Sequence, residues 1–137
     1  MHFPRTMRQV CVATAAVLLL CGCSQSPEKA AKEAREGAGS WGATLSAAAE
    51  RWSSGDISTS YFQSVVTQAS TALREESRTA RKSGGASAAA PVDAVASHVN
   101  ALNDAVARGD RAAAIDAAHA AASAAPANPT PPVARPQ

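Results

Sequence analysis

Two histidines, His98 and His119, are the side chains best suited to bind a metal ion. They lie at nearly equal distances along the chain on either side of Gly109, so two antiparallel helices joined at this glycine would bring them to a similar height. Asp116, one helical turn before His119, would then complete a site of two histidines and one carboxylate. However, His98 borders a seam of valines and His119 ends an exposed stripe, which are ordinary structural positions for histidine. We therefore predict no metal site, and keep this trio as the metal-binding alternative.

Serines are abundant, but the sequence has no motif that is typical of a catalytic site. All three cysteines, Cys11, Cys21 and Cys23, lie near the amino terminus. No serine lies in a Gly-x-Ser-x-Gly elbow, no Cys-x-x-Cys-His is present, and Gly84-Gly85 lacks the Lys-Ser/Thr that completes a phosphate-binding loop. The sequence therefore predicts no enzyme, no catalytic residue and no cofactor.

The amino-terminal segment, 1–23, has the parts of an export signal. Arg5 and Arg8 precede an apolar run, Val10 to Leu20, whose eleven residues are too few for the roughly 20 of a membrane-spanning helix. The run ends in Leu20-Cys21-Gly22-Cys23, which resembles the lipobox of bacterial lipoproteins. That motif has an aliphatic residue, a small residue, Gly or Ala, and then Cys. Cys23 fits this order, with Cys21 at a place more often held by Ala or Ser.

The resemblance implies a lipid anchor. Cys23 would receive a diacylglycerol, signal peptidase II would cleave between Gly22 and Cys23, and acyl chains such as palmitate would hold the mature chain on a membrane. Each buried methylene contributes about 0.8 kcal/mol, so several long chains together make a stable anchor. Ser24 is not the aspartate that usually retains lipoproteins in the inner membrane. This favours the periplasmic face of the outer membrane in a Gram-negative cell.

Cleavage would also change the charge of the protein. The whole chain has a formal net charge of +2, with 13 basic and 11 acidic residues. Removing Arg5 and Arg8 leaves 11 basic residues, which equals the number of acidic residues. The basic residues are scattered among the acidic ones, whereas nucleic-acid binding needs a clustered basic face. We expect a neutral mature domain with no nucleic-acid partner.

The mature sequence begins with a charged, glycine-containing segment, 23–40. Ser26-Pro27-Glu28 has the residue types of a helix start. However, the segment has no large apolar residue, and Gly37, Gly39 and Gly42 are expected to loosen the chain around its end. We predict at best a solvated helix, which serves as a spacer and tethers the domain.

Apolar residues at helical spacing predict an all-α domain over 41–125. Trp41, Leu45, Ala48 and Trp52 share one side of a first helix. Asp56 is expected to cap a central helix whose wide apolar face comprises Ile57, Tyr61, Phe62, Val65, Val66, Ala69, Ala72 and Leu73. These helices would form a hairpin over 41–82 with the aromatic side chains in its core. An exposed Trp41 would instead lie at the lipid interface.

A second hairpin is predicted over 91–125. Ser83-Gly84-Gly85-Ala86-Ser87 indicates a flexible linker over 83–90, and Pro91 would begin the next helix, whose seam is Val92, Val95, Val99, Leu102 and Val106. Asp110 would cap an alanine-rich helix, Arg111 to Ala125, with Ile115 as its one large aliphatic residue. Residues 126–137 are rich in proline and are expected to be disordered.

The two hairpins are related by a weak pseudo-repeat. The shift that places Gly55-Asp56 on Gly109-Asp110 also pairs Leu45 with Val99, Ala48 with Leu102, Trp52 with Val106 and Tyr61 with Ile115. Two such hairpins would bury their seams against each other as a four-helix bundle.

The last hairpin, 95–128, also resembles a single tetratricopeptide repeat. The resemblance rests on Gly109-Asp110, Ala114-Ile115, Ala121 and Pro126. His98, Ala105 and Ala118 occupy the positions where that family has large aromatic residues, and no second copy precedes the hairpin at the spacing of the repeat. The resemblance implies an adaptor that binds other proteins.

Taken together, the sequence predicts a small all-α bundle of two hairpins that is held on the cell envelope by lipid. We expect a non-enzymatic structural or protein-interaction role, with an envelope protein as the partner. One alternative is a periplasmic helical module that binds a small ligand or a metal. The other is a tetratricopeptide-like adaptor.

Overall fold

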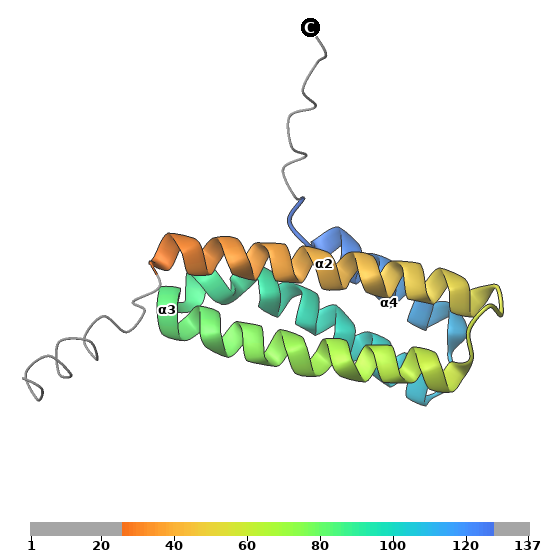
Figure 1. The fold of residues 1–137 in the computed structure, drawn as a ribbon. Coiled ribbons are helices and arrows are strands. Elements are labelled where there is room, and N and C mark those ends of the chain that lie inside the picture. Colours follow the sequence, from red (N-terminus) through yellow and green to blue (C-terminus); the bar gives the residue numbers. More distant parts are fainter. Residues whose placement is uncertain (1–25, 128–137) are drawn as a thin grey trace, which may run out of the picture.

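The computed structural model describes residues 26–127, which form a bundle of helices (Figure 1). Helix α2 spans Pro27–Ser53, α3 spans Thr59–Ala107 and α4 spans Arg111–Ala124. Each helix contacts the other two, and residues 26–127 contain no strand. The predicted all-α class is therefore confirmed for this part of the chain. The predicted signal peptide, 1–22, and most of the proline-rich tail lie outside the described residues.

Helix α3 reverses its direction at Gly85. This residue has φ 75° and ψ −168°, in a region that glycine enters far more readily than other residues. The segments before and after it, 59–84 and 86–107, lie side by side (Figure 1). Asp93 on the second segment accepts a hydrogen bond of 2.6 Å from the Ser77 hydroxyl on the first, and it also pairs with Arg81. The described part of the chain thus has four helical segments.

The predicted flexible linker over 83–90 is wrong. Helical structure continues on both sides of Gly85, and the side chains of Ala88 and Ala89 are buried. We expected Pro91 to begin a helix. Instead, it lies inside the second segment of α3. A single glycine with positive φ reverses the chain here, so the small and polar residues around it remain available for helix formation.

The predicted tether over 23–40 is also wrong for its described part. Ser26 caps α2 as expected, because its hydroxyl accepts a hydrogen bond of 3.3 Å from the Lys29 N–H. From there α2 continues without a break through its three glycines. Its buried side is built from small residues: Ala30, Ala34, Ala38 and Gly42. Such residues bury little apolar surface, but they let neighbouring helices approach closely, so a search for large apolar residues misses this half of the helix.

The turns at Gly55 and Gly109 are built alike. In each turn the glycine N–H donates to the carbonyl three residues earlier, and the N–H of the next aspartate donates to the carbonyl five residues earlier. This is a Schellman motif, and both glycines have positive φ, 84° and 71°. The four bonds are Gly55 to Trp52 (3.2 Å), Asp56 to Arg51 (2.8 Å), Gly109 to Val106 (3.0 Å) and Asp110 to Ala105 (2.9 Å).

The pseudo-repeat changes register after these turns. Asp110 caps α4 as predicted, by accepting a hydrogen bond of 3.1 Å from the Ala113 N–H. Asp56 does not cap α3, because that helix begins two residues later with Ser58 as its cap. Beyond the caps, the shift that aligns the buried residues is therefore two residues smaller than the shift that aligns the two turns. It pairs Phe62 with Ala114, Val66 with Ala118, and Ala69 with Ala121. The predicted pairing of Tyr61 with Ile115 is wrong.

The core contains the valine seam and two of the four large aromatic side chains of residues 26–127. Val92, Val95, Val99, Leu102 and Val106 are all buried, as predicted. Trp52 stacks on Phe62 with ring centroids 4.7 Å apart, and the Arg111 guanidinium lies 4.7 Å from the Trp52 ring centroid. The predicted core position is confirmed for Trp52 and Phe62. It is wrong for Tyr61, whose residue surface is 59% exposed.

Candidate functional site

The three candidate metal ligands do not form a metal site. Residues 26–127 contain no group of three or more His, Cys, Asp and Glu side chains that is placed to hold a metal ion. His119 on α4 instead faces α2, where its Nε2 lies 3.9 Å from Oε1 of Glu50. His98 is half-buried on α3, and Asp116 is exposed on α4. The metal-binding alternative thus finds no support in the described part of the chain.

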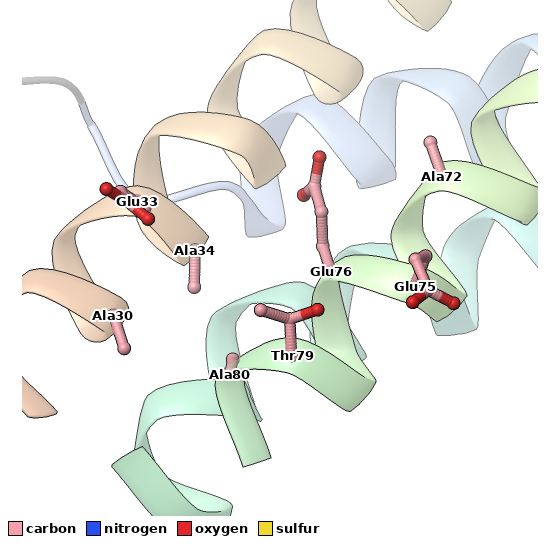
Figure 2. Close-up of a pocket in the computed structure, with 8 residues that line it drawn as sticks. All are labelled: Ala30, Glu33, Ala34, Ala72, Glu75, Glu76, Thr79 and Ala80. Atoms are coloured by element: carbon pink, nitrogen blue, oxygen red, sulfur yellow. The ribbon is translucent and has the colours of Figure 1, made fainter. Parts of the chain in front are cut away.

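A first groove lies between α2 and the first segment of α3. Its volume is about 430 Å³, and small side chains form its floor. Ala30 and Ala34 come from α2, whereas Ala72 and Ala80 come from α3. Figure 2 shows the Glu76 side chain extending from α3 beside these alanines. Glu33, Glu75 and Thr79 also line the groove, so its polar lining is mainly acidic.

Glu76 is the carboxyl group whose surroundings differ most from water. Its Oε2 atom is buried and has no hydrogen-bond partner. Burial raises the pKa of the Glu76 carboxyl above its ordinary value, and a hydrogen bond from the Trp41 side chain lowers it by less. The effect of burial on the pKa is the larger one, because Oε2 has lost its hydrogen bonds to water and has no protein partner in their place. Burial therefore makes the neutral form of Glu76 more stable, relative to the charged form, than it is for a glutamate in water.

Gly37 makes this position of Glu76 possible. The carboxyl group lies against the α2 backbone, and a Cβ atom on Gly37 would stand 2.8 Å from Cδ and 2.9 Å from Oε1 of Glu76. One turn later on the same helix, Trp41 is half-buried and packs against the core. Trp41 therefore has a packing role together with a polar contact.

A second groove lies between the same two helices, nearer to the turn at Gly55. Its volume is about 320 Å³. Thr44, Ala48 and Arg51 of α2 line one side, and Val65 and Tyr61 of α3 with the preceding Ile57 line the other. Tyr61 is the one large apolar side chain that residues 26–127 leave mostly exposed. Tyrosine is enriched at protein interfaces relative to the rest of protein surfaces.

No family model, curated protein or solved structure matches this chain. Its function therefore has to be inferred from its own residues. The lipobox, Leu20-Cys21-Gly22-Cys23, lies outside the described residues. Within residues 26–127, no helix combines the length and the apolar character that crossing a membrane would need.

Sequence reasoning missed both Gly37 and Glu76. A glycine and a glutamate so far apart in the sequence give no sign that they meet. One signal was available: Gly37 and Trp41 are separated by one helical turn, as are Ala30, Ala34 and Ala38. Small residues at this spacing mark a helix face that another helix can approach closely. The Tyr61 groove was missed for a different reason, since Tyr61 was assigned to the core.

Proposed function

We propose that this chain is a lipid-anchored protein of the bacterial cell envelope, whose helical bundle acts through contacts with another protein and catalyses no reaction. The observation that carries the proposal is the motif Leu20-Cys21-Gly22-Cys23, preceded by a basic segment and an apolar run of eleven residues. Ser24 favours the outer membrane, with the bundle in the periplasm. The bundle is the part that a partner would contact.

The position of α2 supports a close attachment to the membrane. Helix α2 begins at Pro27, only four residues after Cys23. Four fully extended residues span at most about 14 Å. The proposed anchor therefore leaves no long spacer, and the Pro27 end of the bundle is held against the lipid surface. With 27 residues, α2 is roughly 40 Å long, so its other end can project away from the bilayer.

The Tyr61 groove supports a role in protein contacts. Tyr61, Ile57 and Arg51 lie near the Gly55 turn, at the end of α2 that is opposite Pro27. Tyrosine and arginine are among the residue types that contribute most to protein interfaces. A partner that approaches from the periplasm would reach this end of the bundle first.

The anchor is tested by substituting its cysteine. Cells that express the chain, Cys23→Ala or Cys21→Ala are grown with a labelled fatty acid, and the isolated proteins are compared. We expect the label in the chain and in Cys21→Ala, because Cys21 only fills the small-residue place of the motif. Cys23→Ala should carry no label and should accumulate uncleaved. Label on Cys23→Ala, or cleavage of this variant at the same site, would show that the anchor proposal is wrong.

The protein contact is tested separately, with a photo-crosslinking amino acid at position 61. The matched control places it at Thr71, which is exposed on the same segment of α3 but outside the groove. In intact cells we expect one discrete crosslinked species from position 61 that is absent from position 71. Equal crosslinking at both positions, or none at either, would contradict an interaction surface at Tyr61 while leaving the anchor untouched.

A further inference from the structure

The Tyr61 groove has a single charged side chain in its lining, that of Arg51. The other lining residues are uncharged: Thr44, Ala47, Ala48, Ile57, Tyr61 and Val65. The two stretches of chain that form the groove lack charge as well, because residues 37–49 and 57–73 contain no Asp, Glu, Lys or Arg. Depletion of charged residues is typical of the core of a protein interface. Arg51 is thus the side chain that can select an occupant by its charge.

The carboxylates nearest to Arg51 in the sequence have other partners. Glu50, the preceding residue, extends toward α4, where its Oε1 lies 3.9 Å from Nε2 of His119. The Asp56 carboxylate accepts a hydrogen bond of 2.8 Å from the Ser54 hydroxyl. Within residues 26–127, Arg51 itself forms no ion pair, and it is exposed. Its guanidinium therefore keeps its N–H donors for a carboxylate that a partner brings.

The shape of the groove favours a segment of protein over a small molecule. Pockets for small molecules enclose most of the ligand surface and usually have volumes of about 300–1,000 Å³. This groove, at about 320 Å³, is small, and it leaves 59% of the Tyr61 surface exposed. A segment of another chain can place its apolar side chains beside Tyr61 while the rest of the segment stays outside the groove.

A second copy of this chain does not supply the complementary charge. In a symmetric dimer centred on the groove, the same face of each copy meets the other. That face brings Arg51 from both copies and no acidic residue from 37–49 or 57–73. Like charges placed together oppose association. Charge complementarity therefore favours a different protein that carries an acidic residue.

We propose that the Tyr61 groove binds an acidic, aliphatic segment of a partner protein. Aliphatic side chains of this segment pack against Tyr61 and Ile57, and an Asp or Glu carboxylate pairs with Arg51. The planar guanidinium can hold a carboxylate through two parallel hydrogen bonds, which fixes the orientation of the segment. This inference rests on the protein contact of the proposed function and names the chemistry of its partner.

The test uses a random library of twelve-residue peptides displayed on phage. The full protein is immobilised through a carboxyl-terminal tag in the presence of phosphatidylcholine nanodiscs, which take up its proposed acyl chains. Peptides that also bind Tyr61→Ala are removed, so that those remaining depend on the groove. We expect them to be enriched in aliphatic residues together with Asp or Glu, and depleted in Lys and Arg.

Variants at Arg51 separate charge selection from a purely structural role of this side chain. Arg51→Glu should select peptides with Lys or Arg in place of the acidic residue, and Arg51→Gln should select with no preference for charge. Arg74→Glu is the matched control, because Arg74 is exposed on α3 outside the groove, and it should select the same acidic peptides as the original chain. Urea unfolding of each variant confirms that the bundle is folded.

A titration then measures the size of the effect. The chain contains a single tyrosine, so one ¹⁹F signal from 3-fluorotyrosine reports on Tyr61. Replacing the carboxylate of one selected peptide by the corresponding amide should weaken its binding about two- to fivefold, as expected for an exposed ion pair. The same replacement should have no effect on binding to Arg51→Gln.

Four results would overturn the proposal. They are the selection of no peptides, selected peptides without an excess of Asp or Glu, the same acidic peptides from Arg51→Glu, and a Tyr61 signal that changes with protein concentration alone, which would place a second copy in the groove. A discrete crosslink from position 61 in cells, combined with no charge preference, would leave the proposed contact standing and remove only its acidic partner.

Discussion

The carboxyl group of Glu76 fills the space that a side chain on Gly37 would need. A Cβ atom at position 37 would lie 2.8 Å from the Glu76 Cδ. The Trp41 side chain, one turn further along α2, donates a hydrogen bond to the same carboxyl group. The contact between α2 and the first segment of α3 therefore includes a glutamate that is partly removed from water. Substitutions at Glu76 and Gly37 should change the stability of the bundle in directions that follow from this burial.

Glu76→Gln is expected to stabilise the bundle increasingly as the pH rises. Burial raises the pKa of Glu76 in the folded state above its ordinary value of 4.5, so the folded chain binds more protons than the unfolded chain in the interval above that value. Its contribution to stability is therefore greatest below pH 4.5 and is lost as the pH rises through the raised pKa. Glutamine has no proton to lose. Urea unfolding of both proteins between pH 4 and pH 7 measures the difference.

Glu75→Gln is the matched control for this measurement. Glu75 is the neighbouring residue, its side chain is 69% exposed, and it forms an exposed ion pair with Arg78 at 3.4 Å. Such pairs contribute about 0–1 kcal/mol, so the variant should follow the original chain closely at every pH. If Glu76→Gln shows no growing advantage over Glu75→Gln between pH 4 and pH 7, the Glu76 carboxyl group is not buried in the folded protein.

Gly37→Ala is expected to raise the free energy of unfolding at pH 7. Alanine is about 0.5–1 kcal/mol better than glycine inside a helix. The three atoms nearest to the new methyl group all belong to the carboxyl end of Glu76, which can rotate into water and so regain its solvation. The variant should also remove the pH-dependent advantage of Glu76→Gln, which the double variant measures. Lower stability of Gly37→Ala would mean that the carboxyl group cannot leave its place.

Gly42→Ala, five residues later on the same helix, is expected to have the opposite effect. Here a Cβ atom would lie 3.0 Å from the backbone oxygen of Ala121 and 3.0 Å from the Cα atom of Ala122. Backbone atoms of α4 cannot rotate away, so the two helices must separate. Overpacking of this kind costs about 1–3 kcal/mol, which exceeds the gain in helix propensity. Thermal unfolding should show a lower midpoint than for the original chain, in contrast to Gly37→Ala.

The sequence was sufficient for the parts of the fold that large apolar residues specify. The seam from Val92 to Val106 and the core place of Trp52 follow from spacing alone, because large side chains at helical intervals have to be buried. The burial of the helix over 27–40 was not predicted, because alanine and glycine carry almost no periodic signal. Their role depends on which backbone approaches them, and that information belongs to the tertiary structure.

The candidate site was predictable to a smaller extent. Tyr61 was assigned to the core because Ile57, Tyr61 and Phe62 together made a wide apolar face. The helix begins two residues later than the pseudo-repeat suggested, and the buried positions are then Phe62, Val66 and Ala69. A difference of two residues in one loop thus separates a core tyrosine from an exposed one. The spacing of apolar residues gives the width of the apolar face of a helix, but it does not show which part of that face the neighbouring helices cover.

The two turns provide a final test, because the same substitution in each should have different effects. Asp110 and Asp56 follow equivalent glycines, and each donates its N–H to the carbonyl five residues earlier. The Asp110 side chain also caps α4 through the Ala113 N–H, whereas the Asp56 carboxylate accepts a hydrogen bond of 2.8 Å from the exposed Ser54 hydroxyl.

Asp110→Ala should therefore lower the free energy of unfolding by about 1 kcal/mol, the usual cost of losing a helix cap. Asp56→Ala should change it by less than about 0.5 kcal/mol, as is typical of an exposed surface position. Ser58→Ala, which removes the actual cap of α3, should behave like Asp110→Ala, since the Ser58 hydroxyl accepts a hydrogen bond of 3.2 Å from the Tyr61 N–H. Urea unfolding at pH 7 compares all three variants. A loss at Asp56 that equals the loss at Asp110 would place the start of α3 two residues earlier, and would return Tyr61 to the register in which it pairs with Ile115.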